Sequence, residues 1–370
     1  MITSINNPVQ ATQIFLVLLV LVLIITLRKR KSFEGLSVNL TQELKGFAIL
    51  AIVFSHISYS LFNENKFLFP LNIAAGVGVN LFLFLSGYGL VMSALKKPLP
   101  VFQFYKRRLL KLYPPFWLTI ILFLGLDFFI LSRTYSLSYI GQALIGFFSR
   151  ADITMDLNSP LWYFTIIVFY YFLFPLVFWR KQPWISAIIL YLIGYLIIRE
   201  NPDSIWRVIH LYKLHILAFP LGVLIGSLVF NYKGSWLEIQ VNNIWPKITR
   251  LKFINIAIYC VFIAFLSWLV GYTAYFSHVG DKRWIEETVS LVTGGALILL
   301  FLIKKIESRL LYWFGFFSYE VYLLHWPILS RFDIFYFWLP AWMATILYLV
   351  FFLGISWSMR WLISKIKILN

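Results

Sequence analysis

Eleven apolar runs divide the chain of 370 residues, and most of them are long enough to cross a lipid bilayer. A hydrocarbon core of about 30 Å requires roughly 20 helical residues, within a range of about 17–25. The runs cover residues 11–27, 46–62, 73–93, 115–131, 161–178, 184–198, 214–230, 253–272, 288–303, 310–329 and 340–362. Hydrophobic residues form 61% of the chain and charged residues 13%, too few to cover a soluble fold. The pattern predicts an all-α, polytopic integral membrane helical bundle of about eleven transmembrane helices and excludes an ordinary soluble enzyme.

The basic residues are distributed unevenly between these runs. The chain has 32 Lys and Arg against 15 Asp and Glu, a formal net charge of +17. In a membrane protein such an excess marks the cytoplasmic loops. When Arg28 to Lys31 are placed in the cytoplasm, 23 of the 32 basic residues fall on that side. The charge therefore predicts that the N-terminus is outside and the C-terminus is cytoplasmic, and nucleic acid is not an expected partner.

We expect two parts in the chain. Residues 1–39 form an extra N-terminal transmembrane helix and a basic cytoplasmic linker, and residues 40–370 form one membrane domain. The first run is followed by basic residues rather than a small-residue cleavage site, so no cleavable signal peptide is expected. The single cysteine, Cys260, excludes an intramolecular disulfide and a cysteine-cluster metal site. Because it lies in an apolar run, we expect it to be a small packed residue.

Lys45 and His56 lie on one face of the second predicted helix. Eleven residues separate them, which corresponds to about 16 Å along a helix and three turns plus about 20°. Lys45 is then at the cytoplasmic edge and His56 near the middle of the membrane. Ionisable side chains at that depth are costly and often functional. The alternative is that His56 only makes an interhelical hydrogen bond.

Glu320 and His325 lie in the run that starts after Arg309. By the same spacing Glu320 reaches mid-membrane on a different helix from His56, so the two side chains could meet in one cavity. The alternative for Glu320 is a neutral or structurally paired carboxyl. His325 lies five residues further towards the outside, and the alternative for it is an interfacial histidine in an aromatic belt.

A basic cluster on the predicted cytoplasmic side contains Arg107, Arg108 and Lys111. Positive charge there is explained simply by anchoring to anionic lipid. The sharper interpretation is a site for a phosphate-bearing cytosolic donor, because guanidinium groups match phosphate oxygens. No phosphate-binding loop, dinucleotide fingerprint or metal-ligand spacing occurs in the chain. No metal is expected.

Five motifs in this order resemble the membrane-bound acyltransferase 3 family, which includes bacterial O-acetyltransferases of cell-envelope glycans. The resemblance extends from about residue 40 to 362. The motifs are Lys45-x10-His56; the phenylalanine-rich segment from Asn80 to Ser86-Gly87-Tyr88; Phe104-Tyr105-Lys106-Arg107-Arg108-x-x-Lys111-x-x-Pro114; Pro160-Leu161-Trp162-Tyr163-Phe164 with Pro175; and Gly315-x-x-Ser318-Tyr319-x-x-Tyr322-Leu323-x-His325. The family commonly has ten core helices, so the resemblance implies that the run 11–27 is an addition.

The resemblance implies transfer of an acetyl or other acyl group from cytoplasmic acetyl-CoA, the co-substrate, to a hydroxyl of an extracytoplasmic glycan. His56 would be the general base or a transient acyl carrier, with Glu320 and Lys45 as its catalytic partners. The other implied roles are binding of the CoA phosphates by Arg107, Arg108 and Lys111, and binding of substrate by Ser86, Trp162, Tyr319 and His325. The implied location is the cell membrane of a bacterium, as a multi-pass protein.

The chain departs from the family pattern in three places. Lys45 and Lys111 stand where the family usually has arginine, so the charge is kept but the bidentate fork is lost. Ile167 stands where some members have a glutamate. The last difference favours capsular or other cell-envelope polysaccharide over peptidoglycan as the acceptor, which would be a glycan or a lipid-linked sugar.

Other classes share several of these features. A polytopic secondary transporter or flippase for an envelope precursor would also have basic cytoplasmic loops and a midplane histidine with a carboxylate. An unrelated family of polytopic O-acyltransferases also uses an intramembrane histidine, but its motifs match less well. A non-enzymatic scaffold is least expected, because buried His and Glu are costly. Dependence on acetyl-CoA distinguishes an acyltransferase from a transporter.

Overall fold

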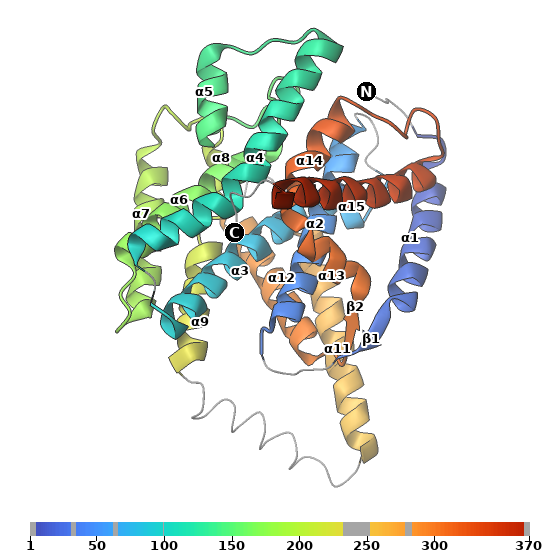
Figure 1. Ribbon diagram of the computed structural model, residues 1–370. Helices are drawn as coiled ribbons and strands as arrows, with labels where there is room; N and C mark the ends of the chain where they lie inside the picture. The colour runs from blue at the N-terminus through green and yellow to red at the C-terminus, as the bar shows by residue number, and fades with distance from the viewer. Residues whose placement is uncertain are drawn as a thin grey trace.

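A computed structural model describes residues 5–30, 35–61, 66–98, 100–231, 252–277 and 283–365, with only the backbone described for 252–255 and 283–284. The elements are α1 (Pro8–Ile25), β1 (Leu27–Lys29), α2 (Val38–Ser60), η1 (Leu71–Ile73), α3 (Ala75–Lys96), α4 (Val101–Leu131), α5 (Leu137–Ile145), η2 (Ser159–Leu161), α6 (Trp162–Val177), α7 (Pro183–Glu200), α8 (Ile209–Lys213), α9 (Ala218–Asn231), α11 (Lys252–Tyr275), α12 (Arg283–Ile303), β2 (Ile306–Ser308), α13 (Arg309–Phe316), α14 (Ser318–Ser330) and α15 (Ala341–Lys365). Figure 1 shows them as one helical bundle.

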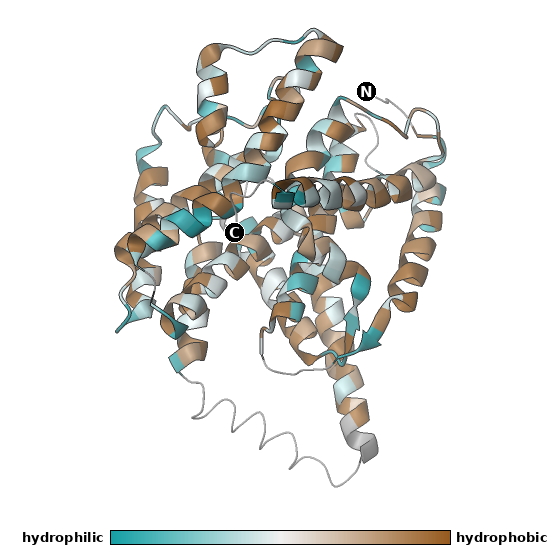
Figure 2. Cartoon of the chain, in the orientation of Figure 1, coloured by the Kyte–Doolittle hydropathy of each residue, from teal (hydrophilic) through white to brown (hydrophobic). Residues whose placement is uncertain are grey.

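The predicted all-α membrane bundle is confirmed. Within the described residues, ten helical segments are long and apolar enough to cross a membrane. They correspond to ten of the eleven predicted runs. Brown, hydrophobic residues cover much of the outside of the bundle, for example along α1 (Figure 2). The predicted orientation of the termini stays a prediction. Most of the predicted cytoplasmic loop 231–252, and the basic residues Lys31, Lys233, Lys247, Arg250 and Lys367, lie outside the described residues.

The remaining run, 310–329, differs from the prediction. It forms two helices, α13 and α14, that are interrupted at Phe317. Helix α13 lies against α2, with a glycine at each of two crossing points. A Cβ on Gly46 would collide with the backbone of Leu311, and one on Gly315 would collide with the backbone of Gln42. The two glycines therefore allow the backbones of α13 and α2 to come into direct contact.

A short two-stranded ladder joins the N-terminal helix to the rest of the bundle. Strand β1 pairs with β2 in an antiparallel ladder, with Leu27 opposite Ser308. Arg30, which follows β1, is buried and donates to the carbonyl oxygens of Phe301 and Leu302. Part of the predicted basic linker therefore forms a strand, seen at the lower right of Figure 1.

The prediction that Cys260 is packed in the interior is wrong. Cys260 is exposed on α11. Only 6% of the most apolar window of α11 is buried inside the protein. An apolar run does not distinguish a side chain that faces protein from one that faces lipid, since both environments favour the same residues.

Candidate active site

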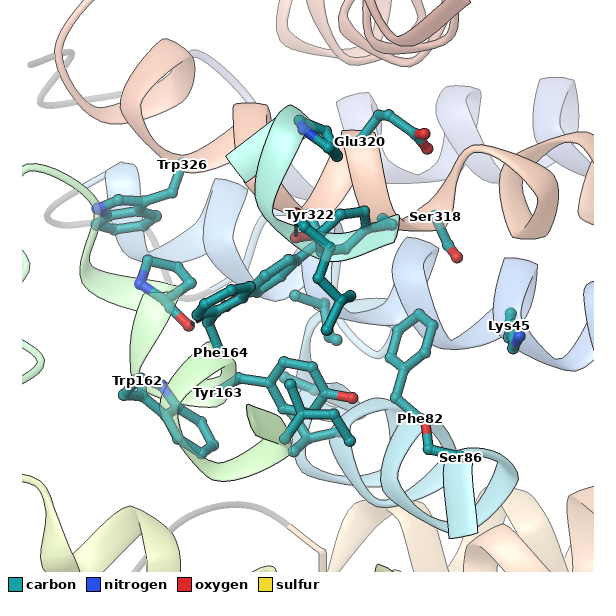
Figure 3. A pocket seen from close by; sticks show the side chains of 18 of the residues that line it. Lys45, Phe82, Ser86, Trp162, Tyr163, Phe164, Ser318, Glu320, Tyr322 and Trp326 are labelled. Carbon is teal, nitrogen blue, oxygen red and sulfur yellow. Dashed lines mark hydrogen bonds between the residues drawn. The ribbon is translucent and has the colours of Figure 1, made fainter. Parts of the chain in front are cut away.

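A cavity of about 890 Å³ lies between α2, α3, α4, α6, α14 and α15. We divide its lining into two ends. The basic end consists of Lys45, Arg107, Lys111, Glu320 and Arg360, and the aromatic end consists of Tyr59, Ser159, Trp162, His210, His215 and Trp326. Figure 3 shows Trp162 and Trp326 at the left of the cavity and Lys45 at the right. Among the described residues that line the cavity, every Lys, Arg and Glu belongs to the basic end.

The basic end is held by α2 and α4, and α4 begins at Val101, before the predicted run 115–131. Lys45 projects from the first half of α2, and Arg107 and Lys111 project from the first part of α4, one helical turn apart. Lys111 is close enough to Lys45 for their charges to interact. Like charges gathered at one place without an equal number of carboxylates are a typical feature of an anion site.

Glu320 neutralises one cation of the basic end. Its carboxylate accepts from Nε and Nη2 of Arg360 on α15, at 3.0 and 3.1 Å. This two-point contact is the strong form of a salt bridge. The guanidinium of Arg360 also lies over the Phe316 ring, 4.2 Å from its centroid. Glu320 therefore offsets part of the positive charge of the basic end. Its carboxylate pairs with Arg360 rather than with His56.

Arg108 faces a second, smaller cavity of about 420 Å³ next to the first. Arg107 and Lys111 line both cavities, and Lys97 and Arg180 line the second. Arg108 stacks over Phe104 and Tyr171. The three predicted phosphate-binding residues therefore surround the junction of two cavities instead of pointing into one.

His56 meets His325 between the two ends. His56 Nδ1 lies 2.6 Å from His325 Nε2, and the rings are nearly coplanar, at 7°. His325 Nδ1 lies 3.0 Å from the carbonyl oxygen of Val321 and 2.9 Å from that of Tyr322. Carbonyl oxygens only accept, so His325 Nδ1 carries the hydrogen and its Nε2 accepts from His56 in the neutral pair. His56 Nε2 is then the nitrogen without hydrogen, ready to accept a proton from a group in the cavity.

The aromatic end contains a second buried histidine. His215 is 3% exposed, and its Nδ1 lies 2.8 Å from Asn80 Oδ1. Asn80 Nδ2 donates to Ser290 Oγ at 2.9 Å, which fixes the amide orientation. The Trp162 ring stacks on His215 with a centroid distance of 5.5 Å and an angle of 19°. His215 therefore donates through Nδ1, and its Nε2 is left as an acceptor.

The loop between α4 and α6 closes the cavity at the aromatic end. Arg331 forms an ion pair with Asp127 at 2.9 Å and donates to the carbonyl oxygen of Leu157. Asp156 pairs with Arg150, but burial raises the pKa of this carboxyl above its ordinary value. The backbone N–H groups of Met155 and Thr154 lower the pKa of Asp152. These contacts hold Ser159 and Pro160 against the cavity.

The structure brings most predicted site residues to one cavity. Its lining contains His56, Glu320, Lys45, Arg107, Lys111, Ser86, Trp162 and Tyr319. His325 contacts His56 from behind the lining, and Arg108 faces the second cavity. The Tyr319 hydroxyl donates to the carbonyl oxygen of Leu112 at 2.7 Å, so it also joins α14 to α4.

Sequence reasoning missed three residues that line the cavity, namely Arg360, His210 and His215. Arg360 is one of the 23 basic residues that the predicted topology places on the cytoplasmic side. A signal was available for it, because a basic residue within the last apolar run is as costly as Glu320 and could have been its partner. His215 lies near the start of the predicted run 214–230 and offered the same signal as His56, whereas His210 precedes that run. Among the described residues, no group of three or more His, Cys, Asp or Glu side chains is arranged to hold a metal ion.

The family model described as an acyltransferase domain, Acyl_transf_3, matches residues 44–361. The match begins within α2 and ends within α15, so α1 lies outside it. No curated protein and no solved structure matches the chain.

Proposed function

The chain belongs to the acyltransferase 3 family, and from that premise we propose that it transfers an acetyl group from cytoplasmic acetyl-CoA to a hydroxyl of an extracytoplasmic glycan. As a member of this family it is a membrane acyltransferase, so the transporter or flippase alternative loses its basis. The proposed acceptor is capsular or another cell-envelope polysaccharide, and the proposed location is the cell membrane of a bacterium.

The observation that carries the proposal is the position of His56 between a basic end and an uncharged aromatic end of one cavity. Acetyl-CoA is an anion with a neutral thioester, and a sugar hydroxyl is a neutral nucleophile. The anion fits the basic end, and the sugar fits the aromatic end. Their reacting atoms would then meet at the only catalytic base that the described lining offers between the ends.

The reaction balances with groups of this chain. His56 Nε2 takes the proton of the acceptor hydroxyl while the hydroxyl oxygen attacks the thioester carbon. The C–S bond then breaks, the ester forms, and the CoA thiolate receives the proton from His56 Nε2. His325 holds His56 in the tautomer that leaves Nε2 free, and it is a positioning residue.

The basic end holds the donor in this proposal. Arg107, Arg108 and Lys111 bind the phosphates of CoA, and Lys45 lies deeper on the way to His56. Phosphate binding by several cations explains why two cavities share Arg107 and Lys111, because CoA carries phosphate groups at two positions along its length. Ser86 and Tyr319 line the space between the donor and acceptor sites.

The test is acetyl transfer by the purified chain in lipid nanodiscs. Wild type releases CoA thiol from acetyl-CoA when acceptor glycan is present, and His56→Ala loses about 10²–10⁴-fold in rate, as expected for a general base. Ser55→Ala is the matched control, because Ser55 is the neighbouring residue, is buried, and does not line the cavity. Wild-type transfer by His56→Ala at normal membrane abundance would reject the proposed role.

A further inference from the structure

The aromatic end of the cavity is the part of the lining that would contact the acceptor in the proposed reaction. The proposed reaction needs an acceptor, but it does not define which kind of sugar. The lining of the two ends differs in charge. Of the described residues at the cavity, the five formally charged ones lie at the basic end, whereas the aromatic end has rings, Ser159 and two histidines.

We propose that the aromatic end is a binding subsite for an uncharged sugar unit, with His215 Nε2 accepting a hydrogen bond from one sugar hydroxyl and Trp162 forming an apolar wall. This inference rests on the proposed function, because it concerns the acceptor of that reaction. It assigns His215 a role as a specificity-determining residue, distinct from the catalytic role of His56.

The hydrogen bonds of His215 determine which partner it takes. Its Nδ1–H is used by Asn80 Oδ1, so Nε2 presents a lone pair. Within the described part of the chain, no group bonds to this second nitrogen. Because His215 lines the cavity, a ligand there that supplies an O–H can donate to this nitrogen. A carboxylate has no hydrogen to offer at neutral pH, and its negative charge, like that of a phosphate ester, would repel the lone pair.

The packing of His215 makes it a fixed feature. The ring is 3% exposed and lies against Trp162 on one face. Ser290 on α12 holds Asn80 on α3, so the two helices position the imidazole together. Gly76, which also lines the cavity, leaves open space next to the ring, since a Cβ there would come within 3.9 Å of His215 Cε1. A rigid acceptor beside an aromatic wall is suited to a sugar ring, which has hydroxyls at its edge and C–H groups on its faces.

The described lining of the aromatic end has no Lys or Arg. A site for an acidic sugar would be expected to contain Arg or Lys for the carboxylate. The described aromatic end contains neither, although the opposite end of the same cavity contains four such residues. A hexose, deoxyhexose or N-acetylhexosamine therefore fits this end, and a uronic acid or a phosphorylated sugar does not.

The first experiment identifies the sugar that loses its ester. The gene is deleted in its own host, and O-acetyl groups are located on the envelope glycans by NMR and mass spectrometry. Loss of an ester from an uncharged sugar supports the inference. Loss from a uronic acid or phosphorylated sugar overturns it and leaves the proposed function intact. No loss of any ester overturns the proposed function itself, so the two failures are distinguishable.

The second experiment tests His215. The acceptor is the ester-free glycan isolated from the deletion strain, and the full chain is assayed in nanodiscs. His215→Phe keeps a ring against Trp162 but removes the acceptor nitrogen, so the KM for glycan rises about tenfold and the KM for acetyl-CoA does not change. His215→Gln, which keeps an amide oxygen, recovers part of the loss.

Tyr212→Phe is the matched control. Tyr212 packs behind Trp162, with ring centroids 6.1 Å apart, and its hydroxyl faces the carbonyl oxygen of Phe148 and not the cavity. It therefore removes a polar atom from the same wall without changing the KM for glycan. An unchanged KM for glycan in a folded His215→Phe protein overturns the inference, and so does an equal rise in Tyr212→Phe.

Discussion

The two ends of the cavity differ in charge and in the kinds of side chain that line them. The basic end gathers four cations around one carboxylate, and the aromatic end has no Lys, Arg, Asp or Glu in its described lining. They are built from some of the same helices, because α2 provides Lys45 to one end and Tyr59 to the other. In the proposed reaction, charge at only one end allows a single cavity to bind an anionic donor and an uncharged acceptor. His56 lies at the boundary between the two ends.

The largest expected effect is a loss of folding stability from a substitution next to the basic end. Gly46→Ala places a Cβ against the backbone of Leu311, which cannot move aside as a flexible side chain can. Overpacking of this kind costs roughly 3 kcal/mol or more. Because Gly46 follows Lys45, the shift of α2 from α13 also displaces the cation. Thermal unfolding of the purified protein in detergent measures the loss.

Gly295→Ala is the control for this substitution. Gly295 lies on α12, another membrane helix, and a Cβ there meets nothing within 4 Å. Its stability should change by less than about 0.5 kcal/mol, apart from the better helix propensity of alanine. Equal unfolding temperatures for wild type and Gly46→Ala would contradict the close contact of α2 and α13.

The next largest effect is a fall in kcat when His56, at the boundary between the two ends, loses its partner His325. His325→Ala removes the acceptor for His56 Nδ1–H, so His56 loses its fixed tautomer and kcat falls about 10²-fold. The KM values for donor and glycan should change little. His325→Gln offers an amide oxygen to His56 and should restore part of kcat, which a merely structural role would not predict. Steady-state kinetics of wild type, His325→Ala and His325→Gln measures the changes in kcat and KM separately.

A smaller effect distinguishes the two ends by substrate. Each of Arg107→Ala and Lys111→Ala removes one charged partner of phosphate and should raise the KM for acetyl-CoA about tenfold, with the KM for glycan unchanged. The rise should be smaller in high salt, since exposed charges are screened. Lys106→Ala is the control, because Lys106 lies on the same turn of α4 but lines neither cavity. A change in the KM for glycan alone would reverse the assignment of the ends.

The smallest effect concerns the loop that closes the aromatic end. Since the pKa of Asp152 is lowered in the folded protein, its charge stabilises the loop above its ordinary pKa of 3.8. That contribution is lost as the pH falls through the lowered folded pKa. Hydrogen exchange at Thr154 and Met155, corrected for intrinsic rates, should therefore be faster in Asp152→Asn than in wild type at pH 7. The two should converge as the pH falls below 3.8 and through the lowered pKa of Asp152, and a constant difference would contradict the role of the charge.

Much of the fold could be predicted from the sequence because apolar length alone specifies a membrane-spanning helix. Ten of the eleven runs correspond to helices that can span. The break at Phe317 could not be predicted, because residues 310–329 remain apolar on both sides of it. The close contact of α13 with α2 could not be predicted either, because it brings together Gly46 on one helix and Gly315 on the other. The exposure of Cys260 is a similar case, since lipid and protein interior select the same side chains.

The candidate site was predictable where a residue violates the membrane pattern within a span. His56, Lys45 and Glu320 were found in that way, and all three line the cavity. Their pairing was not predictable, because Glu320 contacts Arg360 and His56 contacts His325, each across different helices. His215 lies within the predicted run 214–230, so the sequence offered a signal for it, but nothing in the run shows what it contacts. Only its contacts with Asn80 and Trp162 reveal it.

The backbone contacts of His325 have a consequence for the electrical balance of the proposed reaction. Because His325 Nδ1 faces two carbonyl oxygens, it cannot pass a proton onward, and the proton that His56 accepts must leave through His56 Nε2 towards the thiolate. In formal terms an acyl cation moves from sulfur to oxygen while a proton moves from oxygen to sulfur. The two transfers carry equal charge in opposite directions. A membrane voltage would therefore neither drive nor oppose the exchange, and the glycan could be acetylated equally well in energised and de-energised cells that contain acetyl-CoA.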